Sequence, residues 1–117
     1  MRLDVLVVDD DEDIAVATCR ALGRVHATRF APSVDDALAA VAARVPDVVV
    51  SDFYMPTRNG DELLAILAER HPSVRRVLHS SQRAEDQQRF VDSGLAHAFV
   101  CKVEMDALLV TVAGGKR

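Results

Sequence analysis

The chain has 117 residues, half of them hydrophobic and 27% charged, a composition typical of globular proteins. Its length suits one domain, which we expect to span residues 1–117, and its net charge of −4 with scattered Lys and Arg argues against nucleic-acid binding. The sequence opens without a signal-peptide pattern and contains nothing close to the ~20 apolar residues of a membrane span, so we expect a cytoplasmic protein without membrane contact.

Apolar runs in the first half of the chain predict strands at 3–8 and 47–51, and a shorter run of mixed polarity at 26–30 is the candidate for a strand between them. The runs at 3–8 and 47–51 are rich in valine, as is typical of strands buried on both faces. The acidic run 9–13 opens a helix that ends near Gly23, because carboxylates favour the positive end of a helix dipole. A second helix ends at Pro46. The expected buried stripes of these two helices are Ile14, Ala17, Ala21 and Leu22, and Val34, Ala37, Leu38, Val41, Ala42 and Val45.

The same alternation continues in the second half of the chain. Asn59-Gly60-Asp61 leads into a helix that His71-Pro72 breaks. Strands are predicted at 74–79 and 96–101, and a polar helix closed by Gly94 lies between them at 84–92. The buried stripe of a last helix is expected at Met105, Leu108, Leu109 and Val112.

Uninterrupted strand–helix alternation implies right-handed crossovers and a parallel sheet covered by helices on both faces. The predicted fold class is therefore α/β. In open parallel sheets, ligands bind at the carboxyl ends of the strands, near the point where strand order reverses. The polar residues at those positions are Asp9 and Asp10 after the first strand, Asp52 after the third, Ser80 after the fourth and Lys102 after the fifth.

These five residues suit the chemistry of phosphoryl transfer. Three carboxylates at one edge repel one another, so the site would have raised pKa values or would need a cation. An all-oxygen cluster without Cys or His suits Mg²⁺. Lys102 would supply a positive charge to one phosphoryl oxygen and Ser80 a hydrogen bond to another. Asp52, alone at the tip of an apolar strand, is the natural nucleophile, and its product would be an aspartyl phosphate.

A set of short motifs follows in order along essentially the whole chain: Val7-Val8-Asp9-Asp10, Asp52-Phe53-Tyr54-Met55-Pro56, Gly60, Ser80 and Phe99-Val100-Cys101-Lys102. In this ordered set, the sequence resembles bacterial two-component response-regulator receiver domains. The resemblance implies a flavodoxin-like, doubly wound five-stranded parallel sheet of order 2-1-3-4-5 with five helices. It also implies a phosphoprotein of phosphorelay signal transduction.

The resemblance further implies a role for each matching residue around the phosphorylation site. Asp52 would be the phosphoacceptor. Asp10, Asp52 and the backbone carbonyl of Tyr54 would ligate Mg²⁺ directly, and Asp9 would act through water. Lys102 would contact the phosphoryl group.

Switching and partners are also implied by the resemblance. Ser80 would contact the phosphoryl group, and Phe99 matches the aromatic residue that changes rotamer with it. The output face would comprise the helix at 84–92, the strand at 96–101 and the last helix, and two copies could form a homodimer through it. A histidine kinase or phosphotransfer protein would donate the phosphoryl group, and the output would pass to a downstream effector protein or domain. Such a domain catalyses its own phosphorylation and dephosphorylation and is not a turnover enzyme.

Several positions depart from the receiver pattern. Val103 stands where receivers usually have a proline after the lysine, which leaves the geometry of that corner open. His79 occupies a position that is normally aliphatic, and we expect a buried or half-buried histidine without a functional role. Tyr54 and Gln82 occupy positions that tune phosphate hydrolysis in the family, and we hypothesise that the bulky Tyr54 screens the attacking water.

Two other functions remain open from the sequence. Asp9-x-Asp11 resembles the nucleophile motif of haloacid-dehalogenase-type phosphatases, although 117 residues leave little room for the cap that those enzymes need. The second alternative is a non-phosphorylated pseudo-receiver that works only by docking to other proteins. Dinucleotide binding is disfavoured because no glycine-rich turn follows the first strand.

Overall fold

The computed structural model describes residues 2–102 and 105–114, except for the side chains of Met105 and Asp106. Strands and helices alternate throughout this part of the chain. The strands are β1 (Asp4–Val8), β2 (Ala27–Ala31), β3 (Val48–Ser51), β4 (Arg75–Ser80) and β5 (Ala98–Cys101). The helices are α1 (Glu12–Leu22), α2 (Val34–Ala43), α3 (Gly60–Arg70), α4 (Ala84–Asp92) and α5 (Met105–Val112).

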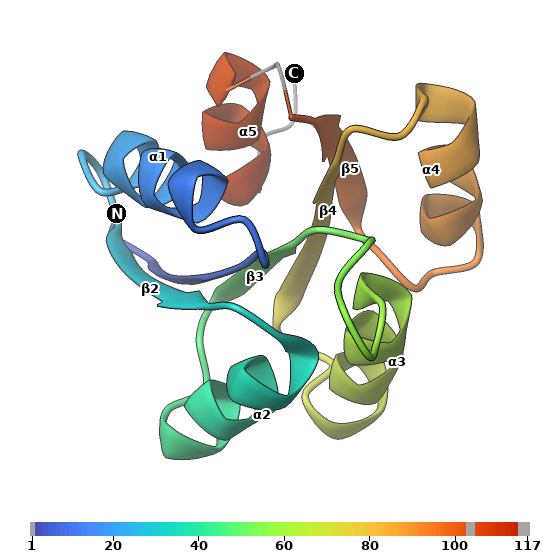
Figure 1. Cartoon of the computed structure of the whole chain (residues 1–117), viewed down its shortest axis with the longest axis horizontal. Coiled ribbons are helices and arrows are strands. Elements are labelled where there is room, and N and C mark those ends of the chain that lie inside the picture. The colour runs from blue at the N-terminus through green and yellow to red at the C-terminus, as the bar shows by residue number, and fades with distance from the viewer. Residues whose placement is uncertain (1, 103–104, 115–117) are drawn as a thin grey trace.

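The strands form one parallel sheet in the order β2-β1-β3-β4-β5. Helices α1 and α5 cover one face of this sheet, and α2, α3 and α4 cover the other (Figure 1). This is the predicted flavodoxin-like, doubly wound fold. The order reverses at β1, because β2 lies on one side of it and β3 to β5 on the other.

The valine-rich strands β1 and β3 are buried because helices cover both of their faces. Val5, Val7, Val48 and Val50 pack with Leu22, Leu108 and Val112 under α1 and α5. Leu6, Val8 and Val49 point the other way and pack with residues of α2 and α3, among them Val34, Val41 and Leu63. A near-continuous apolar run is the expected sequence of such a strand, because successive side chains enter opposite cores.

The helix ends follow from local chemistry. The Asp11 carboxylate accepts hydrogen bonds from the backbone N–H groups of Asp13 and Ile14 and caps α1. Ser33 caps α2 in the same way, through the backbone N–H of Asp36. After α4, Gly94 adopts φ +82°, a left-handed conformation that glycine accepts without steric cost.

Some predicted boundaries and buried stripes were wrong. β2 lies one residue later than predicted, at Ala27–Ala31, and β5 begins at Ala98. Helix α2 stops at Ala43, so Val45 lies beyond it and is 49% exposed. In α1 the fully buried side chains are Ala15, Thr18 and Leu22, and the predicted Ala17 is exposed. Spacing gave the period of this helix, but its packing against β1, β2 and α5 set the rotation about its axis.

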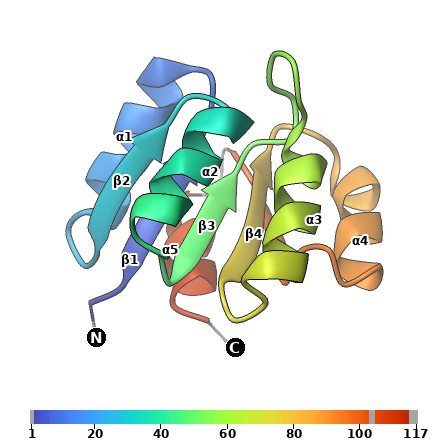
Figure 2. The same cartoon turned by 90° about the horizontal axis from the view of Figure 1, so that it is seen from below.

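All strands point their carboxyl ends to the same edge of the sheet (Figure 2). The loop 53–59, which joins β3 to α3, projects at that edge. This edge therefore collects the residues that follow β1, β3, β4 and β5. None of the described helices is long and apolar enough to cross a membrane.

Candidate functional site

The structure brings three of the predicted carboxylates together. Asp9 and Asp10 follow β1, and Asp52 follows the neighbouring strand β3. One carboxylate oxygen from each residue lies within 4.8 Å of the others. The Asp52 backbone N–H donates to the carbonyl of Val8 at 2.9 Å, which continues the pairing of the two strands beyond their ends. Asp9 and Asp52 are buried and Asp10 is exposed, so the cluster opens to solvent on the Asp10 side.

Lys102 places an ammonium group against two of these carboxylates. Its Nζ lies 2.9 Å from Oδ2 of Asp9 and 3.2 Å from Oδ2 of Asp52. Burial alone would lower the pKa of Lys102, but the hydrogen bond to Asp9 and the charges of Asp52 and Asp9 outweigh it and raise that pKa. Lys102 therefore stays charged and neutralises part of the acidic cluster.

The surroundings of Asp52 disfavour the ionised form of its carboxylate. Burial raises its pKa most, and the charge of Asp9 raises it further. Lys102 and the backbone N–H of Phe53, which donates to Asp52 Oδ1 at 2.8 Å, act in the opposite direction without cancelling the rise. The folded protein therefore holds this carboxylate against an electrostatic cost.

Gly60 allows the loop after Asp52 to close. A Cβ atom at this position would collide with the backbone carbonyl oxygen of Asp52, and the Ser51 hydroxyl would lie 3.0 Å away. The Gly60 backbone N–H also donates to the carbonyl of Phe53 at 2.7 Å. The start of α3 thus rests directly on the peptide that carries Asp52, a closeness that a larger residue would prevent.

The Asp9 and Asp11 carboxylates have different tasks in the structure. Asp9 is 2% exposed, and its Oδ1 accepts from the backbone N–H of Asp11 at 2.9 Å. The Asp11 carboxylate is occupied with capping α1. Asp11, which would be the second acid of an Asp-x-Asp phosphatase motif, therefore serves as a helix cap. This disfavours the phosphatase alternative.

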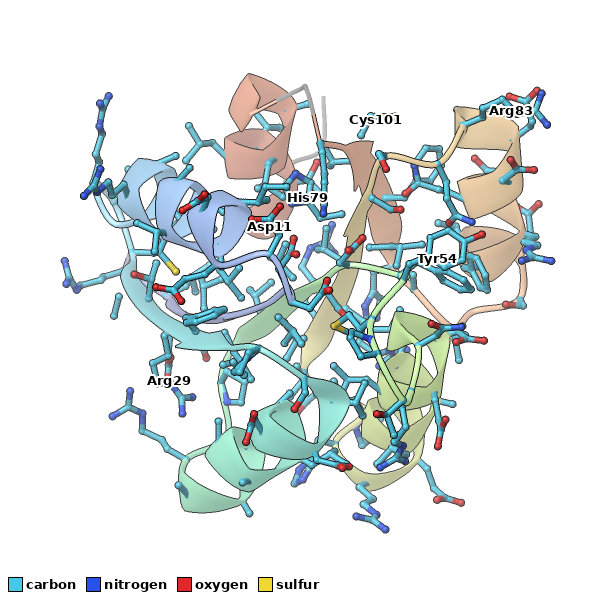
Figure 3. All side chains as sticks on the ribbon, in the orientation of Figure 1. Asp11, Arg29, Tyr54, His79, Arg83 and Cys101 are labelled. Atoms are coloured by element: carbon cyan, nitrogen blue, oxygen red, sulfur yellow. The ribbon has the colours of Figure 1, made fainter. Side chains whose placement is uncertain are left out.

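Tyr54 lies at the rim of the site. Its ring is 61% exposed and stands edge-on to Phe53, with ring centroids 4.8 Å apart. The Gln82 side-chain amide donates to the Tyr54 hydroxyl at 3.3 Å, so the loops after β3 and β4 touch across the rim. Figure 3 shows Tyr54 between the loop after β3 and α4. No hydrogen bond within the described ranges uses the backbone carbonyl of Tyr54, which leaves it available as a ligand.

Ser80 and Phe99 lie on the α4 side of the site. Ser80 is fully buried at the end of β4, and its hydroxyl accepts from the backbone N–H of Gln82 at 3.3 Å. The half-buried Phe99 packs against a cluster that includes Phe53 and Phe90. Among the described residues, no side-chain hydrogen bond joins Ser80 to Asp52, and Phe99 packs in a cluster that does not include Asp52, so the roles expected of them would require movement or a bound group.

His79 is a buried neutral histidine, as expected. It is 3% exposed, and burial followed by the charge of Lys102 lowers its pKa to about 4. Figure 3 shows it on the side of the sheet that α1 and α5 cover. His79 therefore adds no charge to the site near neutral pH. Val103, the other main departure from the receiver pattern, lies outside the described residues.

Sequence reasoning missed two polar groups near the site. Gln87 of α4 is fully buried, and its amide reaches the loop after β4. The signal was its position three residues before the buried Phe90, on the same face of a polar helix. Arg58 binds Asp35 at 2.8 Å and Glu62 at 2.6 Å, next to Thr57 at φ +73°. No sequence pattern indicates that this strained loop is tied to α2.

The donor set of the carboxylate cluster fits Mg²⁺. All donor atoms are oxygens, and the exposed side of Asp10 leaves room for the waters that Mg²⁺ retains. A divalent ion would also relieve the repulsion between carboxylates that Lys102 neutralises only in part.

Comparisons with known proteins agree with this geometry. The family model of the response regulator receiver domain matches residues 5–113. The nitrogen assimilation regulatory protein NtrX of Azorhizobium caulinodans is 36% identical over 83 residues, which cover 68% of this chain and 18% of NtrX. The DNA-binding transcriptional regulator NtrC of Salmonella typhimurium is 41% identical over 72 residues, which cover 60% of this chain and 15% of NtrC.

Solved structures give the same result over nearly the whole chain. The receiver domain of the Francisella response regulator 1452 superposes with a TM-score of 0.86 at 27% identity, covering 96% of this chain and 94% of that one. NtrX from Brucella abortus gives a TM-score of 0.86 at 31% identity, covering 97% of this chain and 26% of that one. In the sequence comparison, by contrast, the chain spans less than a fifth of the length of the curated NtrX and NtrC relatives. It belongs to the response regulator receiver domain family.

Proposed function

We propose that residues 1–117 form one receiver domain that accepts a phosphoryl group on Asp52. The observation that carries this proposal is the position of the Asp52 carboxylate, which lies in contact with the Lys102 ammonium and beside the Asp9 and Asp10 carboxylates. This arrangement combines a nucleophile, a fixed positive charge and an oxygen-lined cation site. Phosphoryl transfer needs these groups, because its catalysis consists mainly of positioning and charge neutralisation.

The donor in this proposal is a phosphohistidine of a histidine kinase or phosphotransfer protein. A carboxylate oxygen of Asp52 attacks the phosphorus, the P–N bond breaks, and the histidine nitrogen keeps the electron pair of that bond. Lys102, already 3.2 Å from Asp52, stabilises the charge on a phosphoryl oxygen. The Ser80 hydroxyl donates to another phosphoryl oxygen and keeps its acceptor bond with Gln82, because a hydroxyl can do both.

Asp10, Asp52 and the backbone carbonyl of Tyr54 would hold Mg²⁺, with Asp9 acting through water. The bound ion would neutralise phosphoryl oxygens during transfer. Asp9 is suited to an indirect role because its two oxygens already bind the backbone N–H of Asp11 and the ammonium of Lys102.

The output face in this proposal comprises α4, β5 and α5. Ser80 and Phe99 lie beside α4 and would transmit the state of Asp52 to that face. A downstream effector protein or domain, or a second copy of the chain, would bind there. We also propose a cytoplasmic location, with which the free thiols of Cys19 and Cys101 agree.

Incubation with Mg²⁺ and acetyl phosphate, followed by intact mass measurement, tests this function. We expect the wild type and the control Asp61→Asn, a carboxylate of the first turn of α3, to gain one phosphate. Asp52→Asn should gain none, and chelation of Mg²⁺ should abolish the gain in every variant. A folded wild-type protein that gains no phosphate would instead support the pseudo-receiver alternative.

A further inference from the structure

Gln87 is a polar side chain buried where an apolar one would be expected. It lies in α4, a helix whose other buried residue is Phe90, and it is 0% exposed. Its Oε1 atom has no hydrogen-bond partner among the described residues. Burying an amide with an unused acceptor costs stability that an apolar side chain of the same size would not lose.

The donor half of this amide is directed at one segment, the loop 81–83 between β4 and α4. Nε2 of Gln87 donates to the backbone carbonyl of Gln82 at 2.8 Å. It also lies 3.5 Å from the carbonyl of Ser80 and 3.8 Å from Sγ of Cys101. One amide group therefore touches the last residue of β4, the middle of the loop and the end of the neighbouring strand β5.

The backbone of Gln82 is held at both its N–H and its carbonyl. Gln87 binds its carbonyl, and the Ser80 hydroxyl accepts from its N–H at 3.3 Å. The side chain of the same residue donates to the Tyr54 hydroxyl. A displacement of Gln82 would therefore move the hydrogen-bond partner of Ser80 and the loop contact of Tyr54 together.

We propose that Gln87 is a positioning residue for the Ser80 hydroxyl and acts through the Gln82 peptide, an inference that rests on the phosphoacceptor function proposed above. With the amide in place, the loop holds Ser80 ready for a phosphoryl group on Asp52. Without it, the Gln82 carbonyl keeps only the long contact from Cys101 Sγ at 3.9 Å, and the loop samples other positions. Burial of Gln87 thus costs stability, and in return the loop is fixed in one geometry at the site.

The first test needs no phosphorylation. Gln87→Met keeps the size of the side chain and removes its donor, and Gln88→Met is the matched control, because Gln88 is exposed and donates to Asp92 at the surface. Hydrogen exchange at the Gln82 backbone N–H, followed by NMR without Mg²⁺, should be about fivefold faster in Gln87→Met, as expected for one lost hydrogen bond. The rate should be unchanged in Gln88→Met. Equal exchange in wild type and Gln87→Met would overturn the proposal.

The second test asks whether Gln87 acts through Ser80. The initial rate of phosphorylation by acetyl phosphate should be about fivefold lower in Gln87→Met, the kinetic equivalent of one hydrogen bond. Adding Gln87→Met to Ser80→Ala should cause no further loss. Independent effects that multiply in the double variant would contradict positioning through Ser80. Absence of phosphorylation in the wild type would reject the proposed function, and the exchange test would then decide on Gln87 alone.

A third measurement covers the case in which Gln87→Met does not fold. In the wild type, the side-chain NH₂ of Gln87 should exchange more slowly than that of Gln88. Beryllofluoride, which mimics the acyl phosphate, should shift the Gln87 side-chain resonances and leave those of Gln88 in place. Side-chain exchange as fast as that of Gln88, or no shift with beryllofluoride although the Asp52 amide responds, would reject the role of Gln87.

Discussion

Replacing Asp52 by asparagine should stabilise the protein, although it removes the proposed nucleophile. One oxygen of Asp52 lies within 4.8 Å of oxygens of both Asp9 and Asp10, and its Oδ2 lies 3.2 Å from Lys102. At an effective dielectric constant of about 20, the repulsion from each of Asp9 and Asp10 raises the free energy of the ionised Asp52 by about 3.5 kcal/mol. The attraction to Lys102 lowers it by about 5 kcal/mol. These three interactions alone leave a penalty of about 2 kcal/mol. Burial of the carboxylate adds to it, and the whole penalty disappears when the charge of Asp52 is removed. The free energy of unfolding should therefore rise by at least about 2 kcal/mol in Asp52→Asn at neutral pH.

The pH dependence provides the sharper part of this test. The pKa of Asp52 is raised in the folded protein, chiefly by burial, so folding favours the protonated form. The penalty is then fully present above the folded pKa, decreases as the pH falls through it, and vanishes below the unfolded pKa of 3.8.

Urea unfolding at low salt, with Mg²⁺ chelated, measures this difference between pH 7 and pH 3.5. The advantage of Asp52→Asn should shrink over that range, and the control Asp61→Asn, which removes a carboxylate from the first turn of α3, should gain no stability over the wild type. Added Mg²⁺ at pH 7 should stabilise the wild type and remove most of the advantage. A less stable Asp52→Asn, or an advantage that is independent of pH, would refute the electrostatic reasoning.

Three further substitutions test other parts of the site. Gly60→Ala should lower the free energy of unfolding by about 2 kcal/mol, because the new methyl group meets the Asp52 carbonyl. Thermal unfolding measures this loss, and its absence would mean that the start of α3 can move away. Tyr54→Ala should shorten the lifetime of the acyl phosphate after the donor is removed, as our hypothesis that Tyr54 screens the attacking water requires; an equal lifetime would reject this role. Asp11→Ala should cost about 1 kcal/mol in urea unfolding as a lost helix cap, with phosphorylation retained. Loss of phosphorylation in Asp11→Ala would instead favour a catalytic role for that carboxylate.

The sequence was sufficient to predict the fold and the acidic cluster, because both depend on strong and simple rules. Valine-rich runs at 3–8 and 47–51 separated by helical patterns imply parallel strands, and parallel strands end at one edge. Asp9, Asp10 and Asp52 therefore had to lie near one another once β1 and β3 were neighbours.

Features that depend on rotation and packing were harder to predict. The stripe of α1 was displaced because a short helix with many alanines fits several rotations, and only contact with the sheet selects one. In the sequence, Gln87 is one of several polar residues of a polar helix. Nothing in the sequence indicates that its amide donates to the backbone carbonyl of Gln82. The tie between Arg58 and Asp35 joins residues 23 positions apart and has no local signature.

The central claim is that the phosphoryl group is carried by the carboxylate of Asp52. After phosphorylation in the presence of Mg²⁺, borohydride reduction converts an aspartyl phosphate to homoserine, and peptide mass spectrometry then locates the converted residue. We predict conversion of Asp52 alone. Conversion of Asp9 or Asp10, or modification of any other residue in place of Asp52, would contradict the account.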